Sequence, residues 1–354
     1  MTAEPWRRIS LRVVSHDEAL SWDQAIASPC ATCEAAPCCT HLKLHDFDVT
    51  TLLHLDYARY LLNFERILLG ITPDGQWHVY YRYPCRHLDR ATTRCTVHAT
   101  PEQPNICQNF SPYGCWYRNA YSQAAGPALL QVDRVRLEWL IAHVQFADDR
   151  TIKAMPPIEE VRAAFQALPA HDDPDPGQAA IERDPVHAAW KTTTLDGSAP
   201  PPSPARTFAQ LAEPCTGCEA YCCTSLIFPQ GPPTVHSQLD FYRYALGFPG
   251  IEVGFGDAGW TFILRTKCRH LVDGKCGVYG KDERPLQCRY YDAHKCGYKN
   301  QFGAPRPTAF VRLRHHEFEA FAATFAFDND GNTIKSPTVE ELRASIEQGW
   351  RAAP

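Results

Sequence analysis

The sequence predicts an α+β fold: two homologous, small, cysteine-rich modules with much irregular structure, arranged as a pseudo-symmetric tandem repeat. Three observations lead to this prediction. Sixteen cysteines fall into two sets of eight with the same order. Runs with helical spacing and β-rich runs follow them in both halves. Proline is frequent, at 29 residues, which keeps the regular elements short.

The cysteines of the two halves keep one register. The spacing between equivalent cysteines drifts only from 185 residues (Cys30 to Cys215) to 181 residues (Cys115 to Cys296). Chance does not produce such a register, so we infer an internal duplication. The first set comprises Cys30, Cys33, Cys38, Cys39, Cys85, Cys95, Cys107 and Cys115, and the second comprises Cys215, Cys218, Cys222, Cys223, Cys268, Cys276, Cys288 and Cys296.

Other residues keep the same register over nearly the whole of each half. Between the halves, the chain is rich in Pro, Asp, Ala and Ser, which is typical of a semi-extended linker. We therefore expect a first repeat at 15–168, a linker at 169–206 and a second repeat at 207–350. The matching residues include Asp56, Arg59 and Tyr60 with Asp240, Arg243 and Tyr244, Trp77 with Trp260, and the run from Cys85 to Leu88 with the run from Cys268 to Leu271.

The CxxC and CC segments are expected in loops or at the start of a helix. After them, apolar spacing predicts a helix over 48–69, with an equivalent over 235–246. The β-rich runs 77–81 and 260–264 come next, and each leads directly to a cysteine.

Turn residues predict the remaining elements. Asp273-Gly274 predicts a hairpin. A strand pair is expected around Phe146 and another around Phe327, the second with a turn at Asp330-Gly331. Each half should end in a short helix. The last of these is expected to have Ser336 as N-cap and Pro337 at its first position.

Charge and hydropathy narrow the classes of partner. The net charge of -5 and the pI of about 6.3 give no electrostatic case for nucleic acid or an anionic membrane. No apolar run approaches the roughly 18–20 residues of a membrane-spanning helix, and 1–14 lack the pattern of a signal peptide. We therefore expect a cytoplasmic protein, in which dense cysteines indicate metal binding or catalysis. The alternative is a disulfide framework in an exported protein.

The spacing of the cysteines suits metal coordination. A CxxC turn can direct two sulfurs to one metal. Neighbouring side chains in extended backbone point opposite ways, so Cys38 and Cys39 are expected to serve different sites, or different atoms of one site, as are Cys222 and Cys223. Eight thiolates per repeat allow two Cys₄ sites, or one with the remaining thiols structural or catalytic. Such soft ligands select zinc, iron–sulfur clusters or copper(I).

Basic residues flank these cysteines. Four thiolates around Zn²⁺ leave a residual charge of about minus two, which nearby donors must offset. The two histidines can be ligands, donors to thiolates or plain surface residues, and the arginines can be donors or ordinary surface residues. The candidates are Arg86, His87, Arg269, His270, Arg284 and Arg289.

The second repeat carries Cys215-x-x-Cys218-x-x-x-Cys222-Cys223, then Cys268, Cys276-Gly277-Val278-Tyr279 and Arg284-Pro285-x-x-Cys288-Arg289. With these residues the chain resembles the YkgJ-type cysteine-cluster family, also called the CxxCxxxCC family of zinc- or iron-chelating proteins. The resemblance covers roughly 85 residues in each half and implies a metal-bearing module. Flagellin lysine methylases contain a similar cluster, for which an iron–sulfur cluster is implied.

The first repeat departs from the family pattern. One extra residue precedes Cys38-Cys39, His98 stands in place of Tyr279, and Gln103 and Gln108 replace Arg284 and Arg289. These departures put an arginine-dependent function of the first half in doubt. They leave its metal binding untouched, because all eight cysteines are kept.

The leading hypothesis is a cytoplasmic metal-binding protein with a cysteine-ligated site in each repeat, serving structure, electron transfer or metal handling. Iron–sulfur is slightly favoured over zinc by the surplus of thiols and the family resemblance. Zinc is favoured by the use of CxxC turns in closed structural sites. No cysteine is followed by proline as in bacterial ferredoxins. Metal ions are the expected partners, and a protein partner stays open.

Two alternatives remain. One is a metal-dependent enzyme with one catalytic and one structural repeat, for example a protein-modifying enzyme like the cluster-containing methylases. No GxGxxG, P-loop, GxSxG or HExxH motif supports it, and its catalytic residues are unknown. The other is a partner-binding scaffold with structural zinc. A further group, His41, His45, Asp46 and Asp48, is interpreted as part of a solvated loop, because the second half lacks it.

Overall fold

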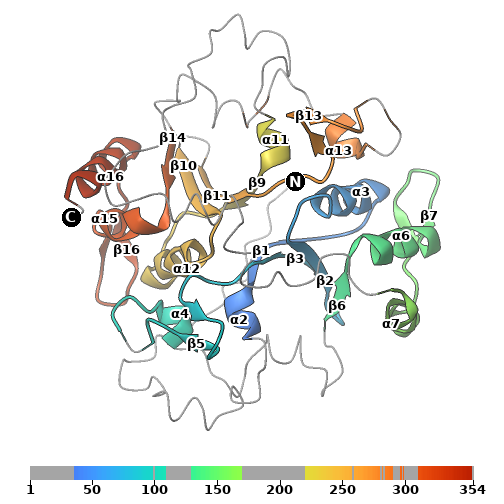
Figure 1. The fold of residues 1–354 in the computed structure, drawn as a ribbon, viewed down its shortest axis with the longest axis horizontal. Helices are drawn as coiled ribbons and strands as arrows, with labels where there is room; N and C mark the ends of the chain where they lie inside the picture. Colours follow the sequence, from blue (N-terminus) through green and yellow to red (C-terminus); the bar gives the residue numbers. More distant parts are fainter. Residues whose placement is uncertain are drawn as a thin grey trace, which may run out of the picture.

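The fold belongs to the α+β class: short helices surround two four-stranded antiparallel sheets (Figure 1). The computed structural model describes residues 36–98, 100–108, 129–169, 220–256, 259–279, 281, 284–289, 296, 298 and 310–352. Apart from Pro169, the predicted linker lies outside these residues. In this described part of the chain, no helix has the length and apolar character needed to cross a membrane.

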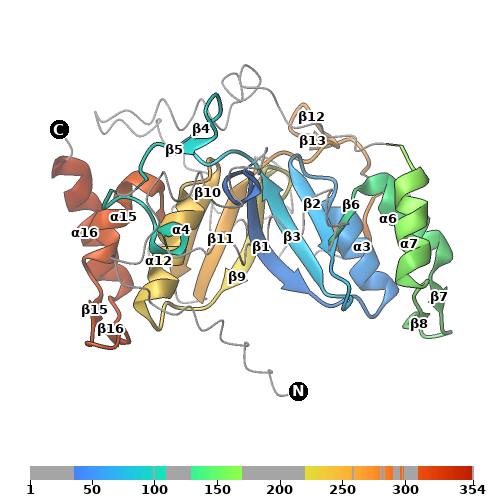
Figure 2. The same cartoon turned by 90° about the horizontal axis from the view of Figure 1, so that it is seen from below.

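The two sheets have the same strand order. The first runs β1 (His41–Phe47), β3 (Trp77–Arg82), β2 (Ile67–Ile71) and β6 (Leu130–Val132). The second runs β9 (Ser225–Gln230), β11 (Gly259–Arg265), β10 (Ile251–Gly256) and β14 (Phe310–Leu313). The edge strands β1 and β9 lie side by side at the centre of the molecule (Figure 2). There, Gln230 Nε2 donates to the carbonyl of Leu44 at 3.4 Å.

The helices and short strand pairs also occur in the same order in both halves. The first half has α2 (Pro37–Thr40), α3 (Leu52–Leu61), the pair β4 (Leu88–Asp89) and β5 (Arg94–Cys95), α4 (Asn105–Gln108), α6 (Arg134–His143), the pair β7 (Gln145–Phe146) and β8 (Ile152–Ala154), and α7 (Ile158–Ala167). The second half has α11 (Tyr221–Thr224), α12 (His236–Leu246), the pair β12 (Leu271–Val272) and β13 (Lys275–Cys276), α13 (Leu286–Arg289), a 3₁₀ turn (His315–Glu317), α15 (Phe318–Ala322), the pair β15 (Ala326–Phe327) and β16 (Thr333–Lys335), and α16 (Val339–Ala352).

Most predicted elements are confirmed. The helix over 235–246, the strands over 77–81 and 260–264 and the strand pairs near Phe146 and Phe327 are present. Asp273 and Gly274 make the expected hairpin turn, with φ of 48° and 73°. Positive φ at both central residues suits a tight two-residue turn.

The helix predicted over 48–69 is wrong at its end. The helix ends at Leu61, and Ile67–Ile71 form β2, which is buried at every position. A short apolar run has the same local appearance in a buried helix and in a central strand. Here the run pairs with β3 on one side and β6 on the other, and this pairing selects the strand.

The solvated loop expected around His41, His45 and Asp46 is also wrong, because His41–Phe47 form β1. Leu42 and Leu44 alternate with polar residues and are buried. A period of two places Leu42 on the core face and His41 on the opposite face. A bulge between Lys43 and His45 then brings His45 opposite Val79, on the side of the buried core. The polar residues therefore belong to an edge strand.

One apolar core extends through both halves. Its buried side chains include Leu42 and Val79 of the first half and Phe228 and Phe262 of the second. The buried Tyr81 hydroxyl also donates to the carbonyl of Pro249 in the other half at 2.7 Å. The two halves therefore share packing and buried hydrogen bonds, which couples their stabilities.

The N-cap of α16 differs from the prediction at Ser336. The backbone amide of Glu341 donates to the Thr338 hydroxyl at 3.2 Å, and the Thr338 amide donates to the Glu341 carboxylate at 2.9 Å. This reciprocal pair is a capping box. We expect Thr338→Ala to lower the free energy of unfolding by about 1 kcal/mol, measured by urea denaturation. Ser336→Ala is the control, and an equal effect of both substitutions would contradict this assignment.

Candidate functional site

The structure describes eleven of the sixteen cysteines, all as thiols. Cys30, Cys33, Cys115, Cys215 and Cys218 lie outside the described residues, so both CxxC pairs are among them. Ten of the eleven form two groups, one in each half. The remaining one, Cys296, is buried.

The first cysteine cluster, as we name it, consists of Cys38, Cys39, Cys85, Cys95 and Cys107. Antiparallel pairing of β1 with β3 brings the turn α2 beside the segment that follows β3, and there the Cys85 amide donates to the Cys39 carbonyl at 2.7 Å. Cys95 comes from the β4–β5 pair and Cys107 from α4. Four chain segments therefore contribute to this cluster.

Mutual effects on pKa show how crowded these thiols are. Cys39 has a pKa well above its ordinary value, first because of its hydrogen bond with Cys38, then because of burial and the charges of Cys38, Cys85 and Cys107. Burial, followed by the charges of Cys85, Cys38 and Cys95, likewise raises the pKa of Cys107. Several thiolates at this place would repel one another, so their joint ionisation calls for a cation among them.

The adjacent cysteines do not lie in extended backbone, so the expectation that their side chains point opposite ways for that reason was wrong. Cys38 and Cys39 occupy one helical turn, with their Sγ atoms 4.0 Å apart. The residue that precedes this turn, Ala36, has a φ of 38°, and the equivalent Ala220 has a φ of 54°. Such left-handed backbone is strained for alanine and is often retained at functional sites.

The second cysteine cluster, defined as Cys222, Cys223, Cys268, Cys276 and Cys288, is built in the same way. The Cys268 amide donates to the Cys223 carbonyl at 2.8 Å. A hydrogen bond from the Cys223 thiol lowers the pKa of Cys268 to about 7. Burial raises the pKa of Cys288 to about 12, with further contributions from Cys222, Cys268 and Cys276. Thiol groups from separate segments therefore converge here too.

The described residues supply suitable donors but no complete metal site. Thiols are soft ligands that suit zinc and iron–sulfur clusters, and five of them gather in each cluster. Across 36–98 and the other described ranges, no three His, Cys, Asp or Glu side chains are arranged to hold a metal ion. The donor chemistry fits a metal, and the CxxC pairs that would add ligands lie outside these ranges.

Arg86 and Arg269 directly follow Cys85 and Cys268, and each is held through its backbone amide by the opposite half of the chain. The amide of Arg86 donates to the Gly247 carbonyl at 2.8 Å, and the amide of Arg269 donates to the Asn63 carbonyl at 2.8 Å. Burial lowers the pKa of Arg86 to about 10, which the charge of Cys85 partly offsets. A buried guanidinium beside a thiol is the kind of donor that a thiolate site requires.

The flanking histidines have polar partners other than thiols. His87 Nε2 lies 3.3 Å from Nε2 of His315, and His270 Nε2 lies 3.2 Å from Oδ1 of Asn63. Burial lowers the pKa of His315 to about 3 and, more modestly, that of His87. Two neutral imidazoles can share one proton in an N–H···N bond.

The two arginines beside Cys288 have different positions. Arg284 lies over the ring of Tyr279, 4.4 Å from its centroid, and its charge acts to lower the pKa of Cys288. Arg289 is exposed, and its Nε donates to the Arg284 carbonyl at 2.8 Å. Arg284 is therefore positioned to act on the second cysteine cluster.

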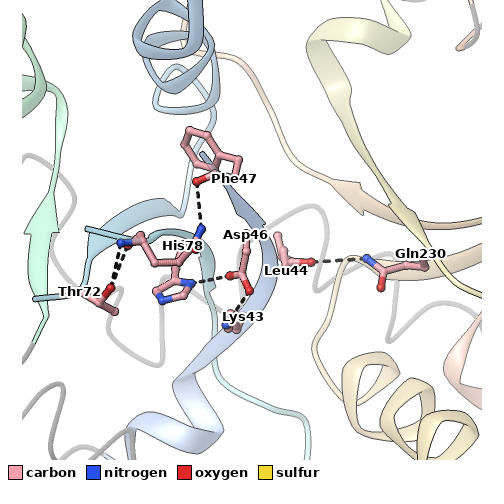
Figure 3. A network of polar contacts seen from close by, with 8 residues as sticks. Lys43, Leu44, Asp46, Phe47, Thr72, His78 and Gln230 are labelled. Carbon is pink, nitrogen blue, oxygen red and sulfur yellow. Dashed lines mark hydrogen bonds and ion pairs between the residues drawn. The ribbon is translucent and has the colours of Figure 1, made fainter. Parts of the chain in front are cut away.

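A polar network on the first sheet lies apart from the cysteines (Figure 3). Asp46 on β1 accepts a hydrogen bond from Nδ1 of His78 on β3 and pairs with Lys43 at 2.9 Å. Burial acts to raise the pKa of Asp46, but the hydrogen bonds and charges of His78 and Lys43 together outweigh burial and lower the pKa. The network links neighbouring strands and includes no thiol.

Sequence reasoning missed the residues that approach each cluster from the other half. Asp240 and Tyr244 of α12 contact cysteine-bearing segments of the first half, and Asp56 and Tyr60 of α3 approach those of the second. Their repetition in register was the available signal. No family model, curated protein or solved structure matches the chain.

Proposed function

We propose that this chain is a metal-binding protein with one cysteine-ligated site, an iron–sulfur cluster or zinc, in each half. The observation that carries the proposal is the convergence of thiols. In each half, five cysteines from four segments, up to about seventy residues apart in the sequence, gather around a CC turn. The role would be structural, electron transfer or metal handling in a reducing compartment such as the cytoplasm.

The CxxC pairs are within reach of the clusters. Cys33 precedes Cys38 by five residues, and Cys218 precedes Cys222 by four. An extended chain spans at most about 3.6 Å per residue, so the nearer cysteine of each pair is tethered within about 18 Å of a CC turn, and the farther one within about 29 Å. Together with the resemblance to the CxxCxxxCC family, this supports a site that combines the CxxC pair with the converging thiols.

We also propose that the chain arose by duplication and that its halves form a pseudo-symmetric pair. The equal order of strands in the two sheets supports this. So do the equivalent positions of α2 and α11, which both carry the CC pair after a residue with positive φ. An iron–sulfur cluster suits the surplus of thiols in each half, and when bound it would supply one-electron chemistry.

The test combines metal analysis with paired substitutions. Protein purified without oxygen is examined by elemental mass spectrometry and by visible absorption, which distinguishes a coloured iron–sulfur cluster from colourless zinc. We expect Cys38→Ser/Cys39→Ser to remove about half of the bound metal, and Cys222→Ser/Cys223→Ser to remove the other half, because each pair contributes to one site.

The controls are Thr40→Ser and Thr224→Ser, which lie on the same two helical turns and leave every thiol in place. Both should bind metal like the unmodified chain. A colourless protein with stoichiometric zinc would select zinc over iron–sulfur. Unmodified protein without stoichiometric metal, or double variants with full metal content, would refute the proposal.

A further inference from the structure

One face of the helix α12 lies against the first cysteine cluster, which belongs to the other half of the chain. Figure 1 shows α12 beside α4 of the first half. Asp240, Tyr244 and Gly247 are spaced i, i+4 and i+7, so they follow one side of this helix and its C-cap. Each of the three contacts a different cysteine-bearing segment.

Asp240 holds the helix that carries Cys107. Its carboxylate accepts a hydrogen bond from the backbone amide of Ile106 at 3.2 Å, and the amide of Asn105 contributes as well. The aspartate is only 4% exposed. The helix α4 has four residues, too few to be stable alone. Its position therefore depends on an anchor, and Asp240 provides one.

Tyr244 and Gly247 hold the other two segments. The Tyr244 hydroxyl donates to the Cys38 carbonyl at 2.7 Å, while the Gly247 carbonyl accepts from the amide of Arg86 at 2.8 Å. A Cβ at Gly247 would lie 3.2 Å from Sγ of Cys85, which is tighter than ordinary packing. Glycine therefore permits the helix end to approach this thiol closely.

The helix α3 does the same for the second cluster. Asp56, also 4% exposed, accepts from the amide of Gln287, the residue before Cys288, at 3.3 Å. Tyr60 is partly buried, and its pKa is raised first by burial and then by Tyr298 and the nearby thiols of Cys288 and Cys222. Asn63 accepts from the Arg269 amide through its carbonyl. The spacing is again i, i+4 and i+7.

We infer that these two helix faces are reciprocal positioning elements: α12 orders the cysteine-bearing segments of the first half, and α3 orders those of the second. Each cysteine site is then complete only when the opposite half packs against it. That these sites hold metal rests on the proposed function, whereas the crossed positioning rests on contacts between protein groups. A substitution in one of these helices should therefore reduce thiol protection and metal binding at the cysteine site of the other half.

The test uses the full chain and compares Asp240→Ala with Asp56→Ala. In chelator-treated protein without oxygen, cysteines are alkylated with a short pulse of iodoacetamide and quantified by peptide mass spectrometry. Removing the acceptor leaves the first backbone amides of the short helix without this partner and loosens the helix. We expect Asp240→Ala to increase labelling of Cys107 about tenfold or more and to leave Cys288 unchanged. Asp56→Ala should give the opposite result.

Two variants serve as controls. Asp133 is an equally buried aspartate that caps α6 within its own half, through the amide of Arg136 at 2.9 Å, so Asp133→Ala should change labelling of neither cysteine. Asp240→Asn keeps an oxygen acceptor and should restore most of the protection of Cys107. Rescue by asparagine would separate the acceptor's role from general packing.

Metal content gives a second measurement. With Cys222→Ser/Cys223→Ser as background, Asp240→Ala should remove most of the remaining metal, while Asp133→Ala should not. The inference would be overturned if thiol protection or metal were lost only in the half that carries the substitution, or if Asp240→Ala and Asp133→Ala caused equal losses. If the unmodified chain bound no metal, the proposed function would fail, and crossed labelling would still decide the positioning.

If the circular dichroism spectrum shows that Asp240→Ala does not fold, Tyr244→Phe is tested in its place. This change removes one hydroxyl and keeps the ring in the core. We expect Tyr244→Phe to raise labelling of Cys38 several-fold, with Cys222 unaffected. Unchanged labelling of Cys38 would contradict the inference.

Discussion

Phe228→Ala is expected to lower the free energy of unfolding by about 3–5 kcal/mol. Phe228 is 1% exposed and lies on β9, opposite Phe262 of β11. Its ring centroid is 6.0 Å from that of His45 on β1. Truncation would therefore leave a cavity at the centre of the molecule, where the sheets of the two halves meet.

Because the core is continuous through both halves, the lost stability should affect the unfolding of the whole protein. Differential scanning calorimetry is expected to show one cooperative transition that moves to lower temperature, with calorimetric and van't Hoff enthalpies in agreement. Leu53→Ala, at a side chain that is 53% exposed, is the control and should change stability by less than about 0.5 kcal/mol. Two separate transitions, with only one shifted, would show that the halves unfold independently.

Glu252→Gln is expected to lower the free energy of unfolding by about 3 kcal/mol at neutral pH. Glu252 lies on β10 and pairs with Arg312 of β14 at 2.6 Å. Burial acts to raise its pKa, but the charge and hydrogen bond of Arg312 and the charges of Arg265 and Arg314 outweigh burial and lower it to about 2. The difference from the ordinary value of 4.5 corresponds to about 3 kcal/mol. The substitution leaves these arginines without their carboxylate.

The sign of the pH dependence follows from the lowered pKa. The ion pair stabilises the fold fully above the ordinary pKa of 4.5, and this contribution disappears as pH falls to the folded value of about 2. Urea denaturation should therefore show a large gap between the two proteins at pH 7 that closes between these values. Glu159→Gln is the control, since its 78% exposed side chain pairs with Arg162 at the surface and should contribute little. A gap that is constant with pH would contradict the assignment.

Reciprocal positioning would couple the two cysteine sites to the packing of the halves. If each cysteine site depends on a helix of the opposite half, the halves cannot lose contact without loosening both sites. Arg86 and Arg269 each lie next to a cysteine and bond to the opposite half through their backbone amides. Binding of a metal at either site would stabilise the packed arrangement, and through it the other site.

Local signals predicted the elements that depend on local chemistry. The Asp273-Gly274 turn and the helix over 236–246 follow from residue types within a few positions of one another. The strands β1 and β2 did not follow in this way. His41–Phe47 carries polar residues that suit a loop, and 67–71 continues the apolar spacing of the preceding helix. Both became strands because β3 lies between them and offers partners on both edges.

The candidate site shows the same division. The repeated spacing identified the cysteines, and the structure brings five described thiols together in each half. The arginine and histidine flanks were identified by adjacency alone, and the structure distinguishes them: Arg284 is close to a thiol, whereas Arg289 is exposed. The repeated Asp56 and Asp240 were visible as matches, but a pattern on one helix does not say which segment its face contacts.

By itself, the sequence determined the α+β class, the order of the cysteines and their likeness between the halves, because residue type, spacing and turn chemistry are properties of neighbouring positions. Only the tertiary structure decided that the halves share one core, that β1 and β9 meet at its centre, and that each central helix serves the cysteines of the other half. These contacts join residues more than a hundred positions apart. They depend on which apolar faces bury each other when the whole chain is folded.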